Sequence, residues 1–221
     1  MTARKKKTSD AALKKAVLAA ALPDIVFDGF TDRLLAAAAK EAGVDKATMA
    51  RLFPDGPLSL VEAFSQSADA DMENAVAALD LKSMKIRERI AAAVKARIAA
   101  LRPHKEAARR AAAFLSLPPH AALGAKLVYR TVDAMWRAIG DTSTDFNFYT
   151  KRGILAAVYS STLLRWFSDA SADETATERF LADRIENVMQ FEKFKAETLS
   201  KLPSMSEILD RFGGRTSASP R

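Results

Sequence analysis

Apolar residues recur at helical spacing along almost the whole chain, and polar or turn-forming residues separate the runs. In residues 83–101, apolar side chains three or four positions apart form one stripe, which is typical of an amphipathic helix. The sequence contains no strand-like alternation of useful length and no internal repeat. The pattern therefore predicts an all-α protein, with two short helices among the prolines at 103, 118 and 119 and further helices over residues 10–22, 32–43, 45–52, 58–80, 83–101, 121–138, 145–168 and 174–199.

The first three predicted helices and the start of the fourth, residues 10–66, resemble the helix-turn-helix domain of TetR-type regulators. The alternative is a compact three-helix unit that needs the same Ala-Gly-Val turn without binding DNA. Residues 16–66 hold four basic residues against seven acidic ones, whereas DNA-binding domains gain much of their affinity from phosphate neutralisation. The expected recognition helix offers only Lys46, Thr48 and Arg51. DNA binding is therefore not favoured.

The net charge of +7 is concentrated on both ends of the chain and on residues 82–110. Cysteine is absent, which excludes disulfides and thiolate metal sites and fits a reducing compartment. No run reaches the ~18 uninterrupted apolar residues that a membrane-spanning helix needs. We expect a soluble, intracellular protein.

Residues that could support catalysis are few and scattered. The two histidines, His104 and His120, each lie beside a proline, without a partner at metal-ligand spacing, and we expect them to be solvated. Ser160 and Ser161 fall inside an apolar helix, where serine hydroxyls usually bond back to the preceding turn. No phosphate-binding glycine loop or nucleophile motif is present in the sequence. The sequence thus predicts no enzyme, no cofactor and no metal site.

The segment GDTSTDFNFYTKR, residues 140–152, is the most informative in the chain. Asp141 and the polar residues after it open a helix, and three aromatics, Phe146, Phe148 and Tyr149, follow at once. Turns are normally small and polar. These aromatics are therefore either ordinary core or a contact surface.

This segment and its neighbours strongly resemble the lipid-binding accessory family of coenzyme Q (ubiquinone) biosynthesis. The resemblance is carried by TVDAMWRAIGDTSTDFNFYTKRGILAAVYSSTLLRWFSD and by ATERFLADRIENVM beyond it. Phe148 stands where the family frequently has tryptophan. The resemblance implies a TetR-like fold in which residues 67–200 form the lipid-binding and dimerisation domain.

The resemblance also implies a function. The protein would bind isoprenoid quinone intermediates and present them to the di-iron demethoxyubiquinone hydroxylase, without catalysing a reaction itself. It would act as a homodimer in a bacterial-type cytoplasm, peripheral to the inner membrane. The alternative is a TetR-type DNA-binding transcriptional regulator with a hydrophobic ligand.

Carried over by position, the partner-binding residues of the family lie around the aromatic segment. We expect Phe148 and Tyr149 to be the exposed contact, whereas Trp136 and Phe146 could face the core. The predicted partner-binding set is Asp133, Met135, Trp136, Asp145, Phe148, Tyr149, Lys151 and Arg152.

A polyprenyl tail needs an apolar cavity between helices, although residues at helical spacing are more often plain core. The predicted lipid-binding set is Leu115, Leu123, Leu127, Trp136, Ile154, Val158, Leu163 and Met189. The helices over 145–168 and 174–199 also carry stripes that would suit a two-fold four-helix interface. These stripes are Ile154, Ala157, Val158, Ser161 and Leu164, and Phe180, Ile185, Val188 and Met189.

The C-terminal segment has an apolar face of its own. Residues 203–213 predict a short amphipathic helix, which is either an ordinary docking helix or a membrane contact. Arginines follow it, and anionic lipid surfaces attract such residues. Residues 1–9 and 214–221 are expected to be disordered tails. The predicted membrane-contact residues are Met205, Ile208, Leu209 and Phe212.

Overall fold

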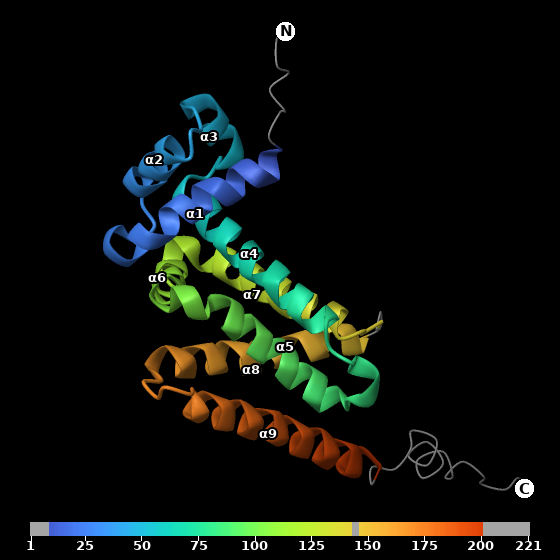
Figure 1. Cartoon of the computed structure of the whole chain (residues 1–221). Helices are drawn as coiled ribbons and strands as arrows, with labels where there is room; N and C mark the ends of the chain where they lie inside the picture. Colours follow the sequence, from blue (N-terminus) through green and yellow to red (C-terminus); the bar gives the residue numbers. More distant parts are fainter. Residues whose placement is uncertain (1–8, 143–145, 201–221) are drawn as a thin grey trace, which may run out of the picture.

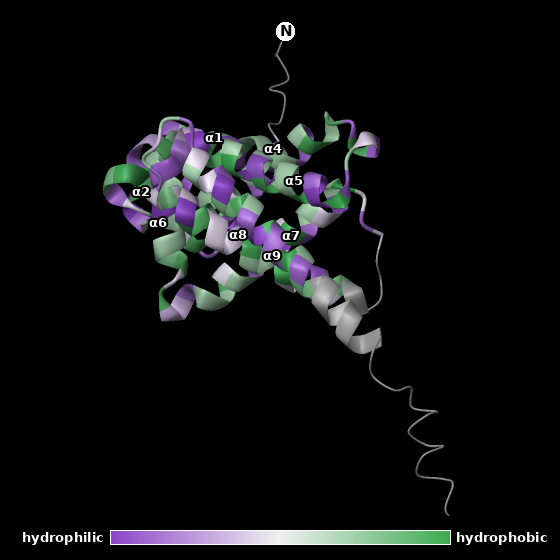
Figure 2. Cartoon of the chain, turned by 90° about the horizontal axis from the view of Figure 1, so that it is seen from below, coloured by the Kyte–Doolittle hydropathy of each residue, from purple (hydrophilic) through white to green (hydrophobic). Residues whose placement is uncertain are grey.

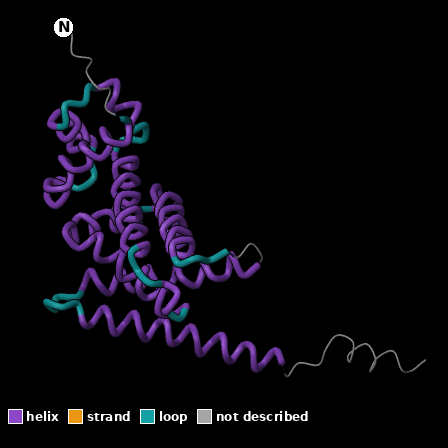
Figure 3. Tube along the Cα trace, turned by 45° about the vertical axis from the view of Figure 1, so that its right-hand side comes forward, coloured by secondary structure: helices purple, strands orange, loops and turns teal. Residues whose placement is uncertain are grey.

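The computed structural model describes residues 9–142 and 146–200, with residues 146–147 and 192–200 described as backbone only (Figure 1). The described part of the chain is helical and contains no strand, which confirms the all-α prediction (Figure 3). Its helices are α1 Asp10–Asp28, α2 Asp32–Glu41, α3 Lys46–Leu52, α4 Pro57–Ala77, α5 Ile86–Leu101, α6 Lys105–Leu115, α7 Ala121–Ala138, α8 Phe146–Ser168 and α9 Thr175–Ser200. Short 3-10 turns cover Leu81–Ser83, Arg102–His104 and Pro118–His120.

Side-chain caps begin each of the first three helices. The Ser9 hydroxyl accepts a hydrogen bond from the backbone N–H of Ala12, and Thr31 and Asp45 cap α2 and α3 in the same way. The prediction that the first helix ends at residue 22 was wrong. Proline at 23 lacks an N–H, yet α1 continues to Asp28 because Ile25 is completely buried in the core.

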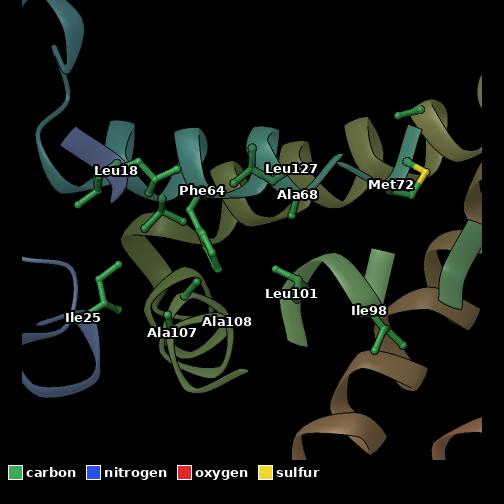
Figure 4. Packing of buried hydrophobic residues seen from close by; sticks show 14 of the residues in the cluster. Leu18, Ile25, Phe64, Ala68, Met72, Ile98, Leu101, Ala107, Ala108 and Leu127 are labelled. Carbon is green, nitrogen blue, oxygen red and sulfur yellow. The ribbon is translucent and has the colours of Figure 1, made fainter. Parts of the chain in front are cut away.

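Helix α4 connects the N-terminal unit to the body. It packs against α1 and α2 near its start and against α5 and α7 farther on (Figures 1 and 4). It therefore crosses the expected boundary at residue 66 without a break. Met72 and Val76 are fully buried, but Leu79 lies beyond the end of α4, within the range predicted for this helix, and is exposed.

The body is built from α5, α7, α8 and α9, with α6 closing the side nearer α1. Helix α8 packs against both α7 and α9, and α9 also contacts α5. Hydrophobic and hydrophilic residues are interleaved along the same helices, as expected for amphipathic helices (Figure 2). No helix within residues 9–142 and 146–200 is long and apolar enough to cross a membrane.

Several predictions lie outside the described residues. These are the two tails, the helix over 203–213 with Met205, Ile208, Leu209 and Phe212, and the partner-binding residue Asp145.

Candidate functional site

A buried arginine organises the junction between α7 and α8. Arg152 is only 2% exposed, and its Nε donates a hydrogen bond to Oδ1 of Asp133 at 2.7 Å. Its Nη1 donates to Oδ2 of Asp141 at 3.4 Å and to the backbone carbonyl of Phe148 at 3.2 Å. The guanidinium carbon also stands 3.4 Å from the centre of the Phe148 ring, which is a cation–π geometry.

The neighbouring residues extend this arrangement. Lys151 Nζ donates to Oδ1 of Asp141 at 3.0 Å and lies 5.4 Å from the Trp136 ring centre. The indole N–H of Trp136 donates to the Lys151 carbonyl at 3.2 Å. We call Asp133, Trp136, Asp141, Lys151 and Arg152 the ion-pair cluster. It joins the C-terminal half of α7, the residues after α7 and the first turns of α8.

The structure changes the interpretation of the predicted partner-binding set. Met135 is completely buried, and Trp136 and Arg152 are 5% and 2% exposed, so these three side chains lie beneath the surface. Trp136 thus follows the core alternative that the sequence left open, and Met135 and Arg152 also lie on the core side of the α7–α8 junction, so a role of these three residues in partner binding stays a prediction. The carboxylate of Asp133 forms salt bridges with two arginines, Arg152 and Arg137. The distance from Arg137 Nη2 to Asp133 Oδ2 is 2.8 Å.

The two aromatics expected to be exposed have different environments. Tyr149 is 67% exposed, whereas Phe148 is half-buried under the Arg152 guanidinium. Their rings meet edge to face, with centres 5.1 Å apart. The expected exposure is therefore confirmed for Tyr149, whereas for Phe148 it was wrong in part, because its ring packs against Arg152.

An apolar cavity of about 290 Å³, cavity 1, lies among α5, α7, α8 and α9. It begins beside the ion-pair cluster, because Trp136 and Lys151 form part of its wall. Ile86 and Met189 line it and are 47% and 42% exposed, so the cavity opens to the surface there. The remaining lining residues are Arg87, Ile90, Thr150, Ile154, Leu155, Val158, Ile185 and Val188.

A second cavity of about 320 Å³, cavity 2, lies on the other side of α8, against α4, α5, α6 and α7. Of the predicted lipid-binding residues, Trp136, Ile154, Val158 and Met189 line cavity 1, whereas Leu115, Leu127 and Leu163 line cavity 2. Leu123 lines neither cavity and packs half-buried against the core. The prediction of one lipid-binding set is therefore divided between two cavities, because Ile154 and Val158 lie on one face of α8 and Leu163 lies on the opposite face.

The predictions about catalytic groups had mixed outcomes. Ser161 bonds back to the Ala157 carbonyl at 2.7 Å, as predicted. His120 is half-buried rather than solvated: its Nδ1 lies 2.9 Å from the Phe114 carbonyl and its ring packs on Phe114. Histidine and carboxylate side chains form no metal-binding group in the described parts of the chain.

Sequence reasoning missed the residues that hold the α8–α9 connection. Both oxygens of Asp169 accept hydrogen bonds, from the backbone and hydroxyl of Ser171 and of Thr177. These bonds, the Ser171 hydroxyl first, hold the pKa of Asp169 well below its usual range. Glu174 nearby accepts from Arg102 and from the Trp166 indole, and the Arg102 bond lowers the pKa of that carboxyl.

Two of the three side chains predicted for the recognition helix, α3, have partners within the chain. Arg51 forms a salt bridge with Asp10, with Nη2 and Oδ1 3.0 Å apart. The Thr48 hydroxyl donates to the Asp45 carboxylate at 2.8 Å, so Lys46 is the remaining member of the predicted set. These internal contacts agree with the acidic charge of the unit.

The all-helical architecture places the chain in the TetR-like fold class. It superposes on the crystal structure of a TetR transcriptional regulator from Nitrosomonas europaea ATCC 19718 with a TM-score of 0.62. The match covers 79% of this chain and 96% of the regulator at 18% identity, which shows the fold alone.

Within that fold class, the sequence points to one particular family. Residues 121–192 match the model of the COQ9 family and span α7, α8 and most of α9. The chain is 30% identical over 207 residues to human "Ubiquinone biosynthesis protein COQ9, mitochondrial", covering 91% of this chain and 64% of that protein. A probable coq9 protein of Dictyostelium discoideum, also described as mitochondrial, is 30% identical over 83% of this chain and 62% of its own length. The chain is thus related to the COQ9 ubiquinone biosynthesis proteins and spans less than two thirds of the length of these relatives.

Proposed function

We propose that the protein is a non-enzymatic accessory factor of ubiquinone biosynthesis that binds isoprenoid quinone intermediates and presents them to the demethoxyubiquinone hydroxylase. The observation that carries this proposal is the position of cavity 1 at the start of α8. Thr150 and Lys151 line the cavity, while Tyr149, the residue before them, is exposed. A bound molecule and a docked partner would therefore meet at the same helical turn.

The chemistry of cavity 1 suits the end of an apolar molecule with a polar head. Its walls are mainly aliphatic, and Arg87 and Lys151 supply the cationic groups in its lining. Its volume is near the lower end of the ~300–1,000 Å³ that is typical of small-molecule sites. A long isoprenoid tail would exceed the cavity and continue past Met189 toward the exposed Phe191 of α9.

Two further parts of the proposal concern surfaces. Exposed apolar residues of α9, Met189 and Phe191, support a homodimer contact beside the opening of cavity 1. A peripheral membrane contact through residues 203–213 remains a prediction.

The lipid part of the proposal is tested by organic extraction of the purified protein and mass spectrometry. Ile154→Trp places a large ring in cavity 1 and should sharply reduce the extracted isoprenoid quinone. Ala182→Trp adds the same ring to an exposed position of α9 and should leave the quinone unchanged. The proposal is overturned if the wild-type protein yields no quinone or related isoprenoid and does not bind liposomes.

The partner part is tested by pull-down of the hydroxylase. Tyr149→Ala should weaken capture while leaving the melting temperature nearly unchanged, because this side chain is mostly exposed. Tyr129→Ala is the matched control, since Tyr129 is an exposed tyrosine of α7 that lines neither cavity. If Tyr149→Ala and Tyr129→Ala capture equal amounts of the hydroxylase, the proposed docking of the hydroxylase at Tyr149 is contradicted.

A further inference from the structure

The two cationic residues in the lining of cavity 1 lie at the same end of it. Arg87 belongs to the first turn of α5 and Lys151 to the second turn of α8, and both helices begin on the same side of the body (Figure 1). Contacts with the residues just after α7 hold both helices there. Arg89 Nη1 donates to the Ile139 carbonyl at 3.5 Å, and Lys151 Nζ donates to Asp141 at 3.0 Å. Cavity 1 therefore has a cationic end, whereas its other walls are mainly aliphatic.

These two cations differ in what they bind within the chain. Lys151 belongs to the ion-pair cluster, so its charge is already balanced. The Arg87 side chain forms no hydrogen bond or ion pair with any residue that the structure describes. Its neighbour Glu88 accepts a hydrogen bond from the backbone N–H of Lys85 at 2.8 Å, as part of the capping box of α5. Arg87 is therefore the cation of cavity 1 whose donors are available to a ligand.

A guanidinium group at one end of an apolar cavity restricts the head group that fits there. Arginine carries its N–H donors in a planar fork, has no acceptor atom and stays charged. The fork forms two parallel hydrogen bonds when a ligand presents two acceptor oxygens side by side. A carboxylate has such a pair, and so does a quinone ring with a methoxy group next to a carbonyl. A quinone ring with methyl groups in the methoxy positions offers the fork one oxygen only.

We propose that Arg87 selects the head group of the molecule in cavity 1, by donating two hydrogen bonds to a pair of adjacent acceptor oxygens. This inference rests on the function proposed above, because cavity 1 is the site assigned there to the isoprenoid quinone. It extends that function by naming the heads that the site prefers. Rings with oxygen substituents and carboxylates bind tightly, and rings with alkyl substituents bind more weakly. The aliphatic walls hold the chain of the ligand in each case.

The test uses two pairs of probes with the same chain length. The first pair is a decyl benzoquinone with two adjacent methoxy groups and the same compound with methyl groups in their place. The second pair is decanoate and decanol. Calorimetric titration of the full chain should show the first member of a pair binding about tenfold more tightly than the second, because one more hydrogen bond to a charged group adds about that much. A preference in the first pair identifies the quinone ring as the source of the oxygens, and a preference in the second pair identifies the carboxylate. Equal affinities within both pairs would overturn the proposal.

Three variants assign the preference to the guanidinium group. Arg87→Met removes the donors and keeps an apolar stem, so both preferences should disappear while the chains still bind. Arg87→Lys keeps the charge without the fork, so it should lose the quinone preference and retain part of the preference for decanoate. Arg179→Met is the matched control, because Arg179 is an exposed arginine of α9 that lines neither cavity, and it should behave as the wild type. A preference that persists in Arg87→Met, or that is lost equally in Arg179→Met, contradicts the role of Arg87.

The result for Arg87 is separable from the result for the proposed function. Arg87 is exposed, so its variants should keep the melting temperature of the wild type and remain comparable with it. If the wild type yields extracted quinone but its probe affinities equal those of Arg87→Met, the role of Arg87 fails and the proposed function stands. If the wild type yields no isoprenoid but prefers decanoate, and Arg87→Met abolishes that preference, the quinone fails as the ligand and the contact with Arg87 stands.

Discussion

Replacing Arg152 with methionine would remove the central cation of the ion-pair cluster and keep most of the side-chain volume. The side chain of Arg152 is 3% exposed, and the side chains of Asp133 and Asp141 are 19% and 6% exposed. Removing one partner of a buried ion pair typically costs about 3–5 kcal/mol, because the remaining charge stays desolvated. Arg137 and Lys151 still compensate part of the carboxylate charge, so we expect the lower end, about 3 kcal/mol.

The assay is chemical and thermal unfolding followed by circular dichroism. For a chain of this size, about 3 kcal/mol corresponds to a fall in melting temperature of roughly 6–12 °C. Arg137→Met is the matched control, because Arg137 binds the same carboxylate from a side chain that is 65% exposed. Such surface pairs contribute about 0–1 kcal/mol. A loss below about 1 kcal/mol for Arg152→Met, or equal losses for the two variants, would refute the assignment of Arg152 to the structural core.

The remaining predictions concern the aromatic pair and the α8–α9 connection. Phe148→Ala should cost about 2 kcal/mol, since the ring is half-buried against Arg152, whereas Tyr149→Ala should cost less than about 0.5 kcal/mol. Equal losses in denaturant unfolding would contradict this difference in environment. Asp169→Asn should destabilise the protein at pH 7, because the lowered pKa of Asp169 means that its carboxylate is favoured in the folded state. The contribution is present above the unfolded value of ~3.9 and is lost as the pH falls toward the folded pKa, so melting curves of wild type and variant should converge below about pH 4. A difference that stays constant between pH 7 and pH 3 would argue against the carboxylate as its cause.

The helices were predictable because their signals are local. The spacing of apolar residues and the caps at Ser9, Thr31 and Asp45 depend only on neighbours in the sequence. Pro23 misled the prediction for the same reason: its local effect favours a helix end, but the packing of Ile25 is a tertiary contribution. Helix ends decided by packing cannot be read from local sequence.

The candidate site was less predictable because it depends on how α7 and α8 are placed against each other. The exposure of Tyr149 was predicted from the sequence and is confirmed. The pairing of Arg152 with Asp133, 19 residues earlier, requires the relative placement of the two helices. The role of Asp141 was also missed, although an acidic residue just after a helix and ten residues before Lys151 is a usable signal. The division of the lipid-binding set likewise depends on which helices pack against each face of α8, and the spacing of residues within α8 does not supply this.

Lys151 makes three contacts that restrict which residues can occupy its position. Its ammonium group binds Asp141, its charge lies over the Trp136 ring, and its side chain forms part of the wall of cavity 1. Arginine would keep the positive charge but is larger than lysine at the cavity wall, and methionine would keep an apolar wall but would remove one cation that binds Asp141. A substitution at this position would therefore change the ion-pair cluster and the shape of cavity 1 at the same time. Its effects on stability and on the cavity would have separate physical origins.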